Sequence, residues 1–91
     1  MSDAADVSGL DGHGGEEAQA VDAVRAVVAW YNARILDARR ASVPDEERVE
    51  ALKAGRQAAL EDHQRLDTAD PQETERIAAL YAARLKELKE S

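Results

Sequence analysis

Apolar residues crowd together in one segment of this chain, residues 26–36, and the rest of the pattern is organised around it. At about 100° per residue, five apolar positions in and before this segment share one helical face, at alternating spacings of three and four. They are Val21, Val24, Val28, Tyr31 and Ile35. Trp30 projects almost opposite that face, so the helix is apolar most of the way round, and such a helix is usually covered on more than one side.

The periodicity predicts three helices, at about residues 16–40, 44–66 and 71–89. The short connection after the first of them makes the first two helices an antiparallel hairpin. We therefore predict an all-α fold for residues 16–91, a three-helix bundle built from a long antiparallel helical hairpin plus a third helix.

Local signals mark where the second and third helices begin. Pro44 is followed by three acidic residues and sets the backbone for a first turn, with Ser42 available as its cap. Asp70, Pro71 and Glu73 form a start that resembles a capping box. We expect the turn between these helices to place His63 opposite Glu73, as an ion pair.

The remaining inner faces follow from the same periodicity. The second helix offers Val49, Leu52, Ala59, Leu60 and Leu66, and the third offers Ile77, Leu80, Tyr81, Leu85 and Leu88. Gly55 interrupts the second helix at a cost of about 0.5–1 kcal/mol relative to Ala. Either another backbone approaches closely there or the position is tolerated on the surface, and we expect the second.

Residues 1–15 are rich in Gly and Asp and poor in apolar residues, so they predict a disordered tail. The net charge of the chain is −7, of which the acidic residues before position 18 supply −5. The body is therefore close to neutral. It shows neither the basic stripe of a DNA-binding protein nor the acidic surface of a DNA mimic, so nucleic acid is not an expected partner.

The candidate chemistry is sparse. The chain has no cysteine, no phosphate-binding glycine loop and no His pair at zinc spacing, and its serines lie in predicted termini and turns away from any His. We expect no enzyme, no metal site and no cofactor. The sequence shows neither a signal peptide nor an apolar run long enough for a membrane, which favours a cytoplasmic protein. Arg outnumbers Lys and Ala is abundant, a composition typical of high-GC bacteria.

Two tyrosines and two arginines fall on the predicted inner faces. Stacking the three helices places Tyr31 in a layer with Arg84, and Tyr81 in the next layer with Arg56. Guanidinium groups beside phenols could form a polar pocket for an anion. The alternative, which we prefer, is structural: the Arg stems cover the apolar seam while their heads reach water.

The face of the first helix that carries Trp30 is the candidate interface. Its members are Trp30, Val27, Ala23, Ala26 and Ala33. Tryptophan is enriched at the centres of binding surfaces, and small residues let another helix approach. The sequence therefore predicts a non-catalytic module that forms a homodimer or binds a helical partner. The alternative is a small nucleic-acid-linked regulator, such as an antitoxin-like or repressor-associated helical protein.

Overall fold

The computed structural model describes the backbone of residues 3–90 and the side chains of residues 15–90. Within this part the chain forms three helices and no strand. They are α1 (Asp3–Arg40), α2 (Glu46–Arg65) and α3 (Pro71–Glu90). The predicted all-α three-helix bundle is confirmed.

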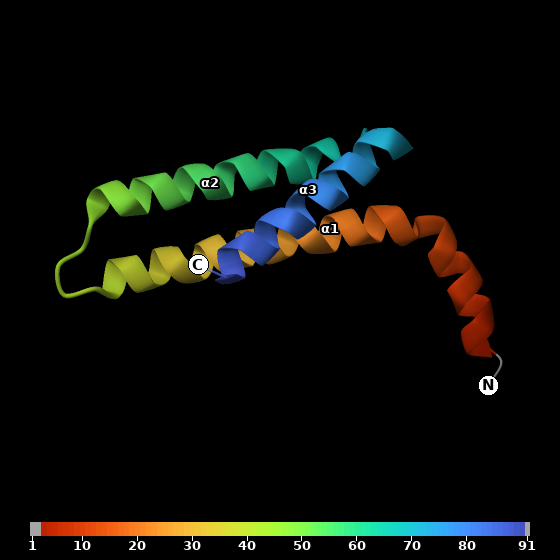
Figure 1. The fold of residues 1–91 in the computed structure, drawn as a ribbon, viewed down its shortest axis with the longest axis horizontal. Coiled ribbons are helices and arrows are strands. Elements are labelled where there is room, and N and C mark those ends of the chain that lie inside the picture. The colour runs from red at the N-terminus through yellow and green to blue at the C-terminus, as the bar shows by residue number, and fades with distance from the viewer. Residues whose placement is uncertain (1–2, 91) are drawn as a thin grey trace.

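α1 is the central helix of the molecule. α2 returns antiparallel to it to form the hairpin, and α3 then crosses α1 obliquely (Figure 1). α2 and α3 both pack on α1, whereas they contact each other only sparsely within the described part. The molecule measures 55 × 31 × 20 Å, and its shortest dimension is about two helix diameters.

Carboxylate caps begin α2 and α3. Asp45 precedes α2, and its carboxylate accepts a hydrogen bond from the backbone N–H of Arg48 at 3.1 Å. The predicted start at Pro44 with Ser42 as the cap was wrong, because Asp45 adopts the extended conformation of an N-cap and places the first turn after itself. At α3, Asp70 accepts from the backbone N–H of Glu73 at 2.7 Å, which confirms the predicted cap.

α1 begins at Asp3, so its backbone continues as a helix into the segment that the sequence predicts to be a disordered tail. The first turns, red in Figure 1, bend away from α2 and α3. The prediction of disorder concerns residues 1–15, and of these residues 1–2 and all side chains before Gly15 lie outside the described part. Among the described side chains, the first buried one is that of Ala20.

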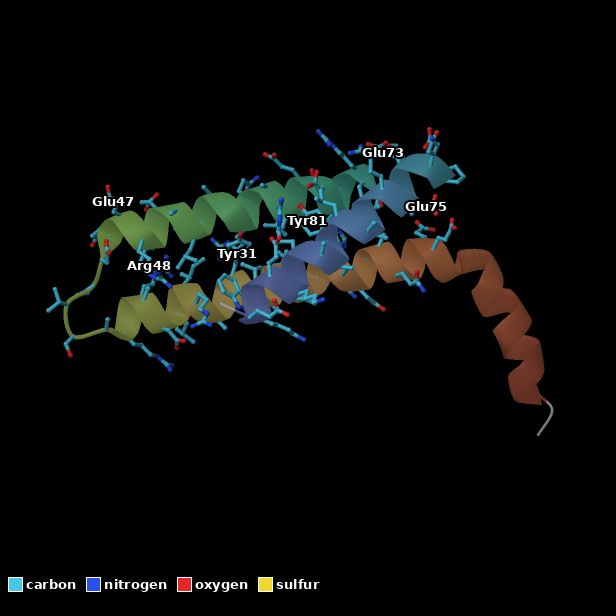
Figure 2. All side chains as sticks on the ribbon, in the orientation of Figure 1. Tyr31, Glu47, Arg48, Glu73, Glu75 and Tyr81 are labelled. Atoms are coloured by element: carbon cyan, nitrogen blue, oxygen red, sulfur yellow. The ribbon has the colours of Figure 1, made fainter. Side chains whose placement is uncertain are left out.

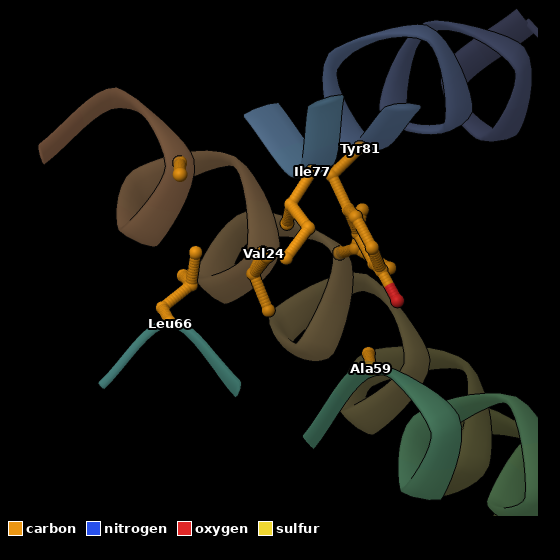
Figure 3. Packing of buried hydrophobic residues seen from close by; sticks show 7 residues of the cluster. Val24, Ala59, Leu66, Ile77 and Tyr81 are labelled. Carbon is orange, nitrogen blue, oxygen red and sulfur yellow. The ribbon is translucent and has the colours of Figure 1, made fainter. Parts of the chain in front are cut away.

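The core lies where α2 and α3 meet α1 (Figure 3). One cluster of buried apolar side chains draws on all three helices and the turn after α2: Ala20, Val24, Val27, Ala59, Leu66, Ile77 and Tyr81. Towards the hairpin connection the buried surface continues with Ile35, Val49 and Leu52. The structure thus selects Val27 as a fully buried residue, where the periodicity favours Val28, which is only partly buried.

The regular layers expected from the sequence do not form. Leu60 and Leu80, which we expected on inner faces, keep 39% and 44% of their surface exposed. The predicted ion pair between His63 and Glu73 was also wrong, because Glu73 pairs with Arg76 of its own helix at 3.5 Å. The common cause is the oblique course of α3, which follows α1 instead of running alongside α2.

Candidate interaction surface on α1

Trp30 lies on α1 and is partly buried. Its ring system and the ring of Tyr31 form a T-shaped pair, with 5.2 Å between centroids and an angle of 86° between planes. The guanidinium carbon of Arg34, one turn further on, lies 5.0 Å from the centroid of the indole. These contacts come from its own helix, and they hold the indole in a defined orientation while part of its surface stays accessible.

The small residues around Trp30 differ in exposure. Ala23 and Ala26 are partly buried, and Ala33 is exposed. Val27 is fully buried in the core cluster with Ile77, so it does not belong to an accessible surface, and its assignment to the interface was wrong. The reason is that α3 packs on the side of α1 that we expected to be uncovered. The residues that remain are called the Trp30 surface: Ala23, which also packs against the core cluster, Ala26, Trp30 and Ala33.

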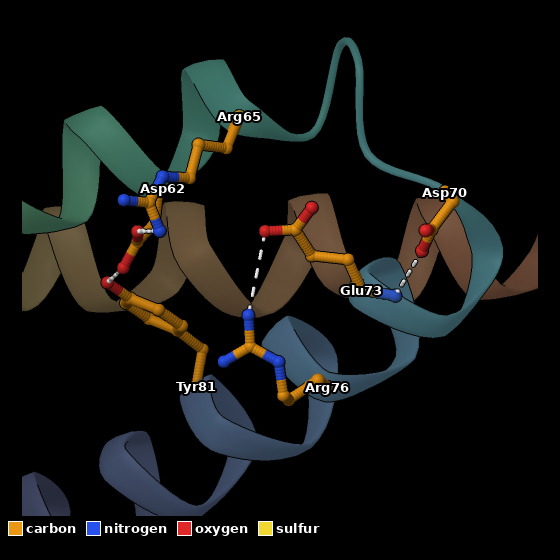
Figure 4. Close-up of polar contacts among 6 residues, drawn as sticks. All are labelled: Asp62, Arg65, Asp70, Glu73, Arg76 and Tyr81. Carbon is orange, nitrogen blue, oxygen red and sulfur yellow. Dashed lines mark hydrogen bonds and ion pairs between the residues drawn. The ribbon is translucent and has the colours of Figure 1, made fainter.

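Tyr81 is the largest fully buried side chain, and it joins α3 to α2. Its hydroxyl donates a hydrogen bond to the carboxylate of Asp62, which also pairs with Arg65 at 3.4 Å (Figure 4). Burial raises the pKa of Tyr81 from 10.0 to about 12, and the hydrogen bond and negative charge of Asp62 add to this rise. Arg84, whose guanidinium lies 5.2 Å from the ring centroid, opposes it. Tyr81 therefore stays protonated and acts as a donor.

Tyr31 fills the space above Gly55 between α1 and α2 (Figure 2). A Cβ atom on Gly55 would lie 2.5 Å from the ring of Tyr31, closer than such atoms ever approach. The expectation that Gly55 is a tolerated surface position was wrong, since the ring of Tyr31 packs against it and would have to shift to admit a Cβ. A glycine in a helix was the only sequence signal for this contact.

The four residues of the predicted polar pocket each contact a different partner. Arg56 donates a hydrogen bond to the side-chain oxygen of Asn32 at 2.9 Å, linking α2 to α1, and Arg84 stacks on Tyr81. Arg56 and Tyr31 therefore connect α2 and α1, whereas Arg84 and Tyr81 contact each other within α3. The heads of both arginines contact other side chains, and both interpretations, anion binding and the preferred structural role, stay predictions.

A hollow of about 240 Å³ lies where α1 and α2 join. We call it the hairpin hollow, and it is lined by Ala38, Ala41 and Val43 with the charged residues Arg34, Asp37 and Arg48, beside the cap Asp45. Figure 2 shows Arg48 between α1 and α2 at this end of the molecule. No pattern in the sequence indicates this site, because it depends on how the connection folds back over α1.

Two further kinds of feature are absent from the described residues. In that part of the chain, no group of three or more His, Asp or Glu side chains could hold a metal ion. No helix there is both long and apolar enough to cross a membrane. Comparison with known protein families, curated proteins and solved structures finds no match for this chain.

Proposed function

We propose that this protein is a non-catalytic interaction module that self-associates through the Trp30 surface of α1. The observation that carries the proposal is the oriented indole of Trp30 at the edge of the bundle, held by Arg34 and Tyr31 and bordered by alanines. A rigid aromatic side chain loses little conformational entropy when it binds, and small neighbours allow a second helix to come close. A helical protein partner is the alternative occupant of the same surface.

The proposal is tested by sedimentation of the whole chain. Replacing a tryptophan at the centre of an interface typically costs about 2 kcal/mol or more, which weakens association about 30-fold. Trp30→Ala should therefore shift a dimer to monomer at concentrations near its dissociation constant, and far-UV circular dichroism should show that the helices remain.

A second variant is needed because Trp30 is partly buried, so Trp30→Ala also removes contacts within the chain. Ala33 is exposed, so Ala33→Arg should block the approach of another helix without disturbing the core. The matched control is Ala83→Arg, the same substitution at an exposed alanine of α3. Loss of the dimer in Ala33→Arg but not in Ala83→Arg supports the proposal. A wild-type chain that sediments as a monomer at all concentrations overturns self-association.

A further inference from the structure

The hairpin hollow is lined by both apolar and charged residues. The apolar ones are Ala38, Ala41 and Val43, and the charged ones are Arg34, Asp37, Asp45 and Arg48. A cavity of about 150 Å³ can hold a benzene-sized group, so a hollow of about 240 Å³ has room for one branched apolar side chain.

One residue of the lining is itself a side chain of that kind and projects into solvent. Val43 belongs to the connection between α1 and α2 and is 85% exposed, the most exposed of the large apolar residues described. A projecting valine and a partly apolar hollow are thus found on the same end of one chain. A surface that carries both a projection and its complement is suited to contact a second copy of itself.

The charges around the hollow are also self-complementary. Arg34 and Arg48 are balanced by Asp37 and by Asp45, which line the same hollow. Among the described residues, the side chains of Arg48 and Asp37 form no ion pair within the chain. In a two-fold interface, residue i of one copy meets residue j of the other and the reverse, so each cation can face an anion.

The hollow continues the Trp30 surface along α1. Trp30, Arg34, Asp37 and Ala41 follow one another at spacings of four, three and four, so they lie on one stripe of the helix. Arg34 belongs to both features, because it covers the indole and also lines the hollow. A second copy that lies along this stripe would cover the hollow as well.

We infer that two copies of this chain associate about a two-fold axis, with Val43 of each copy seated in the hairpin hollow of the other and Arg48 facing Asp37 across the interface. This inference rests on the proposed function and specifies its geometry. The second copy is the occupant that fits the balanced charges of the lining and the exposed side chain of Val43.

The test exchanges charges across the axis. Asp37→Lys and Arg48→Glu each place like charges opposite one another, so each variant should dimerise at least about tenfold more weakly than the wild type. The double variant Asp37→Lys, Arg48→Glu restores opposite charges and should recover the affinity. Both new charges interact favourably with the helix dipole, since the Lys at position 37 would lie near the C-terminus of α1 and the Glu at position 48 near the N-terminus of α2. The monomer should therefore stay folded.

Val43→Ser provides an independent readout. Because the side chain is exposed, its loss should leave the unfolding free energy unchanged while the dimer weakens. If Ala33→Arg disrupts the dimer but Val43→Ser and both charge variants leave it intact, this geometry is overturned and the proposed function stands. The geometry is also overturned if both single charge variants dimerise weakly and the double variant does not recover the affinity. A monomeric wild type overturns both proposals.

Discussion

Tyr81 combines burial, a hydrogen bond and a stacked cation in one side chain. Removing its hydroxyl would leave the carboxylate of Asp62 with Arg65 and with partial access to solvent. A hydrogen bond to a charged group contributes about 1.5–3 kcal/mol. The lower end of that range applies here because Asp62 keeps a second partner.

We therefore expect Tyr81→Phe to lower the free energy of unfolding by about 1.5 kcal/mol at neutral pH. The folded pKa of about 12 lies above the unfolded value of 10.0, so the stabilisation is complete below pH 10 and is lost as the pH rises through the folded value. Urea unfolding of both proteins across this range measures the difference. A difference that is constant with pH contradicts the assignment, and titration in a Tyr31→Phe background isolates the Tyr81 phenol.

Gly55 is a second residue whose role depends on a single neighbour. In a helix, Gly→Ala usually stabilises by about 0.5–1 kcal/mol, whereas overpacking costs about 1–3 kcal/mol. Because a Cβ would lie 2.5 Å from the ring of Tyr31, overpacking dominates here.

We expect Gly55→Ala to destabilise the wild type by about 1 kcal/mol. In a Tyr31→Ala background the same change should become stabilising, since only the helix propensity remains. Thermal or urea unfolding of the four proteins gives the coupling between the two positions. Equal effects in both backgrounds would mean that the ring moves aside without cost.

At the scale of the elements, the sequence predicted the N-cap of α3 correctly but not the N-cap of α2. Asp70 was found from the sequence because an acid, a proline and a second acid follow a standard spacing. At α2, two candidate positions lie three residues apart, and sequence preference does not distinguish Ser42 from Asp45. The choice depends on the path of the connection, which the contacts of the hairpin decide.

This difference gives a matched pair of variants. Asp45→Ala should lower the unfolding free energy by about 1 kcal/mol, because it removes the carboxylate that accepts from the N–H of Arg48. Ser42→Ala should have almost no effect. Denaturant unfolding of both variants is the measurement, and a larger effect of Ser42→Ala would place the cap at the other residue.

At the scale of the whole molecule, periodicity predicted the three helices and the hairpin but not which faces meet. α1 is apolar most of the way round, so the sequence alone permits either Val27 or Val28 as the inward residue. Because α3 crosses α1 obliquely, Val27 becomes the buried residue and Leu80 stays exposed. The hairpin hollow and the bond between Asp62 and Tyr81 join residues distant in sequence, and no local spacing signals them.

The sparse contact between α2 and α3 has a consequence for cooperativity. Within the described part, the two helices act on each other mainly through α1, so they resemble two ligands of one receptor. Whichever helix docks first bears the entropy loss of ordering α1, and the other then docks on a helix that is already ordered. The two docking events are therefore positively coupled with little direct contact between the docked parts, and the coupling is reciprocal: loosening α3 loosens the hold of α1 on α2.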